Sequence, residues 1–178
     1  PSSRRSSRGT DAGARAAPRS SCTDPPRRPV RGLSLIHISQ PTVDADDVAA
    51  IGYCFGGGIV LNMARLGTDI DGGVSYHGSL ATDNPAGEGD IKTHVLVFNG
   101  ADDPMVTAEH IAAFKKEMEA AGADYTFVNY PGAVHSFTNP GATAVGEKFG
   151  LPLAYDEEAD RDSWAKTQAF FTEIFAGD

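Results

Sequence analysis

The sequence predicts an α/β fold with three layers, in which helices cover both faces of a doubly wound, mostly parallel sheet. Short apolar runs that end at glycine, asparagine or proline alternate with longer stretches whose apolar residues recur at helical spacing. The chain has 178 residues, of which 40% are apolar, which is enough for one domain with a sizeable core. No apolar run approaches the twenty residues needed to cross a bilayer, so we expect no membrane partner.

The front of the chain differs in composition from the rest. Residues 1–32 hold eight arginines and two aspartates, a net +6, whereas residues 33–178 carry a net −15. The basic part has too few apolar side chains to offset the entropy cost of ordering, so residues 1–40 are predicted to be a disordered basic segment. Residues 33–39, LSLIHIS, resemble a translated sequencing adapter, which favours an artefactual origin over a nucleic-acid arm or a transit peptide. The acidic remainder would repel phosphates, so no nucleic-acid partner is expected.

The predicted domain, residues 41–178, starts with a strand and a helix. Residues 48–51 are apolar without alternation, which is typical of a strand covered on both faces. Gly52 and Gly56 follow, and both are expected to remove Cβ atoms that would collide in a tight turn. The next helix is predicted to end near Gly67 and to turn one apolar face to the core, formed by Ile59, Val60, Met63 and Leu66.

Three further strands are predicted at residues 73–77, 93–98 and 125–130. A helix is expected over residues 107–121, with Thr107 as its N-cap and Gly122 after its end. A final helix is predicted over residues 157–176, with a core face made of Trp164, Phe170, Phe171, Ile174 and Phe175.

Cys54 occupies the strand-to-helix turn, where a nucleophile elbow places its reactive side chain. A helix N-terminus presents unpaired amides and a positive dipole, which favour a thiolate at this position. The backbone amide of Phe55 points the same way and is a candidate oxyanion donor. The alternatives for a lone cysteine in a glycine-rich apolar stretch are a buried small hydrophobe or a redox-sensitive thiol.

Further polar residues follow the later predicted strands. His77 ends the second strand, Asp102 and Asp103 follow the third, and His135 follows the fourth. The carboxyl ends of parallel strands meet at one edge of a sheet, so these side chains should gather around Cys54. A histidine there would move the thiol proton, and an aspartate would orient its ring. The order nucleophile, acid, histidine is that of α/β-hydrolases, although this reasoning does not separate Asp102 from Asp103.

The motifs GYCFGG at 52–57, GADDPMV at 100–106 and GAVHSF at 132–137 resemble those of the dienelactone hydrolase family of α/β-hydrolases. The resemblance covers roughly residues 41–178, the C-terminal part of a family domain, and implies that the N-terminal strands of the domain are missing. It implies a catalytic set of Cys54, Asp103 and His135. It also implies hydrolysis of a small-molecule ester or lactone through a thioester acyl-enzyme, without a cofactor. An inactive truncated remnant is the alternative.

Three residues are candidates for contact with the substrate. Tyr53 either lines the pocket or packs beside the nucleophile, and His77 either touches the substrate or only packs and makes hydrogen bonds. Asn139 occupies the position, four after the histidine, at which well-known dienelactone hydrolases have arginine. A clamp for a substrate carboxylate is therefore not expected there, and the substrate is predicted to be another ester.

The number of cysteines and the spacing of the histidines outside the predicted site indicate neither a disulfide nor a metal site. Cys22 and Cys54 are too few for a disulfide framework, which favours a reducing compartment and a cytoplasmic location. His94 and His110 have no metal-ligand spacing to other candidate ligands.

Overall fold

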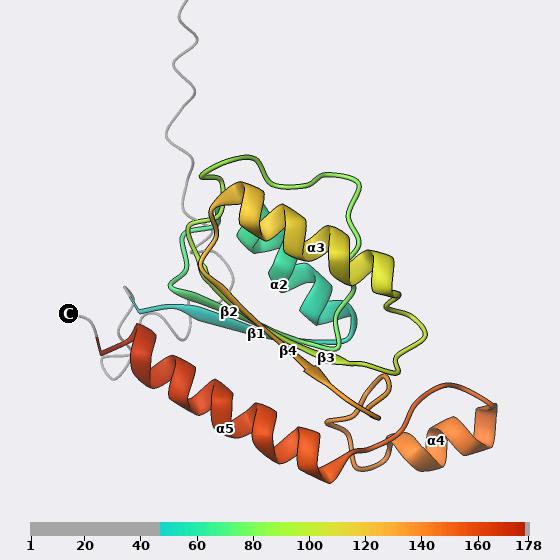
Figure 1. Ribbon diagram of the computed structural model, residues 1–178. Coiled ribbons are helices and arrows are strands. Elements are labelled where there is room, and N and C mark those ends of the chain that lie inside the picture. Colours follow the sequence, from blue (N-terminus) through green and yellow to red (C-terminus); the bar gives the residue numbers. More distant parts are fainter. Residues whose placement is uncertain (1–46, 177–178) are drawn as a thin grey trace, which may run out of the picture.

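The computed structural model describes residues 47–176, so the predicted basic segment 1–40 lies outside the described residues. In chain order the elements are β1 (Ala49–Tyr53), α2 (Phe55–Arg65), β2 (Gly72–Tyr76), β3 (His94–Gly100), α3 (Ala108–Ala121), β4 (Tyr125–Tyr130), α4 (Ala142–Phe149) and α5 (Glu157–Ile174). The four strands are parallel and lie in the order β1-β2-β3-β4. Helices α2 and α3 cover one face of the sheet and α5 lies on the other, which confirms the three-layer α/β fold (Figure 1).

Two apolar cores hold the layers together, one on each face of the sheet. The core beneath α2 and α3 includes Leu61, Val95, Val97, Phe114 and Met118. The core on the α5 side includes Val74, Tyr76, Leu96, Phe98 and Phe137. In β3, Val95 and Val97 pack into the first core and Leu96 and Phe98 into the second, so this strand is covered on both faces.

Helix α3 begins and ends where the sequence predicts. The Thr107 side chain accepts a hydrogen bond from the His110 amide at 3.3 Å, and Gly122 takes a left-handed conformation with φ of 65°. Phe114 and Met118 then face the sheet as expected. The short helix α4 was not predicted.

The predicted core face of the last helix is partly wrong. Trp164 is 47% exposed and Phe175 is 38% exposed, whereas Ala159, Ser163 and Thr167 are buried. These small side chains let α5 approach the sheet closely, and the Tyr76 hydroxyl lies 2.5 Å from Thr167 Oγ1. Large rings on that stripe would hold the helix away from the sheet, so Trp164 lies outside it.

The predicted burial of β1 and α2 also needs correction. Ile51 is 39% exposed, because β1 pairs only with β2 and carries no further strand within residues 47–176. In α2, Ile59 and Leu66 are exposed, and the face toward the sheet is formed by Gly57, Val60, Leu61 and Ala64.

A buried ion pair joins α2 to α3. The Arg65 guanidinium donates to both carboxylate oxygens of Glu117, at 2.8 and 2.9 Å, and also to the Leu80 carbonyl at 2.9 Å. The same carboxylate accepts a hydrogen bond from the Ala86 amide at 2.9 Å. Both charged side chains are at least nine-tenths buried. The pair thus ties the end of α2 to the middle of α3 and to the loop between β2 and β3.

Candidate active site

The turn from β1 to α2 holds Cys54 in a strained backbone conformation, with φ of 53° and ψ of −118°. Its amide donates to the Tyr76 carbonyl at 3.0 Å, which ties the turn to the neighbouring strand. A Cβ at Gly52 would lie 2.1 Å from the Gly56 carbonyl oxygen, so Gly52 is required, as expected. A Cβ at Gly56 would meet nothing within 4 Å, so that part of the prediction is wrong.

The second position that excludes a side chain is Gly57. A Cβ there would lie 2.7 Å from Ser75 Oγ and 3.0 Å from the Gly78 Cα. The first turn of α2 therefore presses against the end of β2, and the close approach fixes the direction in which the helix leaves the elbow.

The side chains of Cys54, His135 and Asp103 form a hydrogen-bonded chain. His135 Nε2 lies 3.1 Å from Cys54 Sγ, and His135 Nδ1 lies 2.7 Å from Asp103 Oδ2. The other Asp103 oxygen accepts from the Met105 amide at 2.9 Å. Asp103 is buried, whereas Asp102 is exposed, so the structure pairs Asp103 with the histidine.

The environment of His135 favours its protonated form. The hydrogen bond to Asp103 raises the pKa of His135 above its usual range, against the opposing effect of burial, and the contact with Cys54 adds to the rise. Because a carboxylate only accepts hydrogen bonds, the Asp103 contact puts a proton on Nδ1. In the neutral ring, Nε2 is then free to accept the thiol proton.

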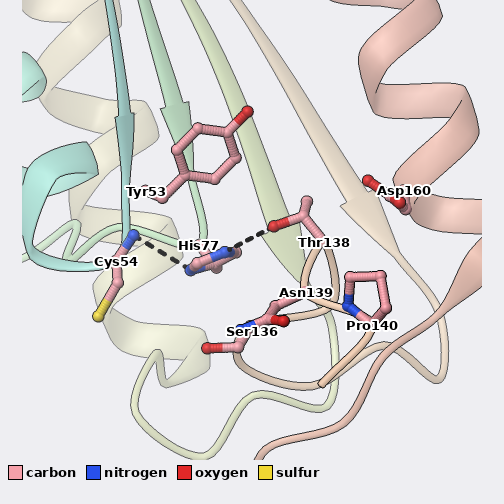
Figure 2. A pocket seen from close by; sticks show the side chains of 8 residues that line it. All are labelled: Tyr53, Cys54, His77, Ser136, Thr138, Asn139, Pro140 and Asp160. Atoms are coloured by element: carbon pink, nitrogen blue, oxygen red, sulfur yellow. Dashed lines mark hydrogen bonds between the residues drawn. The ribbon is translucent and has the colours of Figure 1, made fainter. Parts of the chain in front are cut away.

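His77 lies beside this chain, with its side chain buried. Its Nδ1 lies 3.2 Å from the Cys54 amide, which shares its hydrogen between this ring and the Tyr76 carbonyl. The proton of the neutral ring therefore sits on Nε2, which donates to Thr138 Oγ1 at 3.2 Å (Figure 2). The ring packs against that of His135, with centroids 4.8 Å apart. Burial, and then the charge of His135, lower the pKa of His77 to about 4.

Strained backbone is concentrated at this site. Among the described residues other than glycine, positive φ angles occur at Cys54, His77 and Ser136, with values of 53°, 39° and 62°. All three residues line the same pocket. Such conformations cost about 1–3 kcal/mol each and tend to cluster where function requires a fixed geometry.

The pocket above the elbow has a volume of about 450 Å³. Its lining comes from the elbow, the end of β2, the loop after His135 and the start of α5, and consists of Tyr53, Cys54, His77, Ser136, Thr138, Asn139, Pro140 and Asp160 (Figure 2). The predicted residues Tyr53, His77 and Asn139 are therefore brought together with Cys54.

Phe55 does not line the pocket, and several residues that do line it were not predicted from the sequence. The Phe55 side chain is 81% exposed and lies outside the lining, and its amide is the first of α2, a position without an intrahelical partner. The loop residues 136–140 could have been found from their adjacency to His135. Asp160 lies within an acidic stretch of α5, and no sequence signal separates it from its neighbours.

The two other histidines within residues 47–176 are engaged elsewhere. His94 pairs with Asp124 at 2.9 Å on the surface, and His110 belongs to the cap of α3. Within residues 47–176 no group of three or more histidine, cysteine or carboxylate side chains could hold a metal ion. No helix in that range has the length and apolar character required to span a bilayer.

Comparisons with known proteins identify a matching family and several similar chains. The model of the dienelactone hydrolase family matches residues 33–175. An uncharacterised protein of Caenorhabditis elegans is 33% identical over 140 residues, which cover 78% of this chain and 87% of that protein. A carboxymethylenebutenolidase homologue of Yersinia pestis is 26% identical over 73% of this chain.

Among solved structures, the dienelactone hydrolase-like promiscuous phosphotriesterase P91 from metagenomic libraries is 38% identical, with a TM-score of 0.67. The match covers 76% of this chain and 56% of that one. The chain spans 48% of the length of the Yersinia relative, about half.

Proposed function

This chain belongs to the dienelactone hydrolase family, and we propose that it is a cysteine-dependent hydrolase of carboxylic esters or lactones. The observation that carries the proposal is the hydrogen-bonded chain of Cys54, His135 and Asp103 at a strand-to-helix elbow. In this proposal, Cys54 is the nucleophile, His135 moves the proton, and Asp103 holds the ring in the tautomer that faces sulfur.

In the proposed acylation step, the Cys54 proton passes to His135 Nε2 as Sγ attacks the substrate carbonyl carbon. The new C–S bond gives a tetrahedral oxyanion, and the Phe55 amide is the oxyanion donor that we propose. The adduct collapses by breaking the C–O bond, and His135 returns its proton to the leaving alkoxide. The product of this half-reaction is a thioester on Cys54.

Deacylation runs through the same groups. His135 Nε2 takes a proton from a water molecule, whose oxygen attacks the thioester carbonyl. The C–S bond then breaks and the carboxylic acid leaves, while the proton returns to sulfur. The Met105 amide holds the Asp103 carboxylate, and Asp103 holds the His135 ring. The imidazole therefore need not rotate between the two half-reactions.

Relatives point to substrates of different charge. A carboxymethylenebutenolide is a lactone that carries a carboxylate, whereas a phosphotriester has no net charge. Both reactions begin with attack of a nucleophile on an activated ester. We therefore assign this chain an activated ester as substrate, with Tyr53, His77 and Asn139 next to it.

The decisive experiment is intact-mass spectrometry after brief mixing with p-nitrophenyl acetate. We expect an acetyl adduct on the wild type that hydroxylamine removes, as a thioester requires. The variant Cys54→Ala should give no adduct and lose turnover by about a thousandfold or more.

The control is Cys54→Ser, which retains a nucleophilic atom at the elbow and should be acylated slowly. Acetylation confined to lysines of a folded wild-type sample, with equal turnover by Cys54→Ala, would refute the proposal.

A further inference from the structure

The pocket carries negative charge that no lining residue balances. Of the residues that the structure describes around it, none is lysine or arginine. The Cys54–His135 pair sums to zero whether its proton is on sulfur or on nitrogen, and His77 is neutral because its Nδ1 accepts a hydrogen bond from the Cys54 amide and so carries no proton. Asp103 and Asp160 then leave the site with two negative charges.

Asp160 is held in place at the pocket wall. It lies in the first turn of α5, is half-buried, and its Oδ2 accepts a hydrogen bond from the Tyr155 hydroxyl at 3.0 Å. Figure 2 shows the carboxylate projecting from the helix on the far side of the pocket from Cys54. Burial raises the pKa of Tyr53, the hydrogen bond with Tyr76 opposes the rise, and the Asp160 charge adds to it.

The cations of α5 do not neutralise this carboxylate. Arg161 pairs with Glu157 at 3.4 Å, and Lys166 pairs with Asp162. These two pairs are spaced i,i+4 along the exposed part of the helix. The charge of Asp160 is therefore presented to whatever fills the pocket.

We propose that this site selects uncharged or cationic esters and discriminates against esters that carry a carboxylate, with Asp160 as the specificity-determining residue. The inference rests on the proposed function, because it concerns which ester the Cys54 centre accepts. A substrate anion in the pocket meets the charge of the half-buried Asp160 at the wall and that of the buried Asp103 behind His135. This lowers kcat/KM by about five- to tenfold relative to a neutral isostere.

A series of acetate esters that differ in charge tests the selection. The probes are 4-acetoxybenzoate, 4-acetoxybenzamide and 4-acetoxy-N,N,N-trimethylanilinium, which share the acetyl group and differ in the charge of the leaving group. We expect the wild type to favour the amide and the cation over the anion. The variant Asp160→Asn should raise kcat/KM for the anion relative to the amide by about threefold to fivefold. Added salt should narrow the wild-type preference.

The matched control is Glu158→Gln, which removes one negative charge from the same helical turn at an exposed position outside the pocket. Its anion-to-amide ratio should equal that of the wild type. If Asp160→Asn leaves the ratio unchanged while the amide is still turned over, the inference is wrong and the hydrolase proposal stands.

Alkylation of Cys54 gives a second readout that needs no hydrolysis. The rates at which iodoacetamide and iodoacetate alkylate Cys54 are followed at its peptide by mass spectrometry. Each rate is divided by the rate at which the same reagent alkylates 2-mercaptoethanol. We expect iodoacetamide to be favoured about five- to tenfold, with the bias reduced in Asp160→Asn and retained in Glu158→Gln. A preference for iodoacetate would mean that His135 dominates the field and would overturn the inference. The same bias without turnover of any of the three esters would overturn the hydrolase proposal alone.

Discussion

Replacing His77 with asparagine should reverse the order of stability of wild type and variant between neutral and acidic pH. The pKa of His77 falls from 6.5 to about 4 on folding, so the folded state excludes a proton that the unfolded chain binds. The stabilisation is therefore complete above pH 6.5 and is lost as pH falls toward 4. The full loss is about 3 kcal/mol, since each pKa unit corresponds to about 1.4 kcal/mol.

Asparagine at position 77 keeps one of the two hydrogen bonds of the imidazole. Its side-chain oxygen can take the place of Nδ1 and accept from the Cys54 amide, but it does not reach Thr138, and the ring contacts with His135 and Phe137 disappear. At pH 8 we expect His77→Asn to be less stable than the wild type by about 2 kcal/mol. The variant has no imidazole at position 77 to titrate. The free energies of unfolding of wild type and variant, plotted against pH, should therefore cross at about pH 5.

Urea denaturation from pH 4 to pH 8 measures this difference directly. Thr138→Val is the matched control, because it removes the same hydrogen bond and leaves the imidazole in place. Its stability should run parallel to that of the wild type. A constant difference between wild type and His77→Asn across the whole range would show that the fold does not hold His77 neutral, and would refute the tautomer assigned from the two hydrogen bonds.

Three further predictions concern the elbow, the acid and the buried ion pair. Gly52→Ala should cost more than about 3 kcal/mol, because its Cβ would meet backbone at 2.1 Å, whereas Gly56→Ala should be tolerated; thermal melts that rank the two in the opposite order would contradict the elbow geometry. Asp103 raises the pKa of His135, a stabilisation present below pH 6.5 and lost as pH rises through the folded pKa, so urea titrations should show a larger deficit for Asp103→Asn at pH 5.5 than at pH 9. Arg65→Met should cost about 3–5 kcal/mol by leaving Glu117 charged and buried, and the double variant with Glu117→Leu should recover most of that in the same assay; equal stability of the two variants would mean that the lone carboxylate carries no penalty.

Local signals in the sequence were sufficient for the strands and for the elbow. The four strands are short segments with glycine, asparagine or proline near their ends, and Thr107 and Gly122 mark the limits of α3 chemically. The family motifs singled out Asp103 rather than Asp102, and the structure places Asp103 against His135. Its role in catalysis stays a prediction.

Features that depend on packing between distant segments were not predictable in this way. Helix α4 has only eight residues with Gly146 inside it, and its larger apolar side chains, Val145 and Phe149, are exposed, so it leaves no core-facing stripe to detect. Trp164 was expected in the core because it is apolar, but the close approach of α5 to Tyr76 requires small residues. Asp160 reaches the pocket only because α5 crosses beneath β2 and β3, a relation that no local spacing encodes.

The Arg65–Glu117 pair has a mechanical consequence for the active site. Helix α2 has Cys54 at its start and Arg65 at its end, about 15 Å apart along the axis. A tilt of about 5° at the ion pair would displace the opposite end by about 1 Å, an error that can reduce the rate of a positioned reaction about a hundredfold. The ion pair at the C-terminal end of α2 thus fixes the orientation of the helix and, through it, the position of Cys54 Sγ. Surface engineering of α3 near Glu117 would change the geometry of a centre that it never touches.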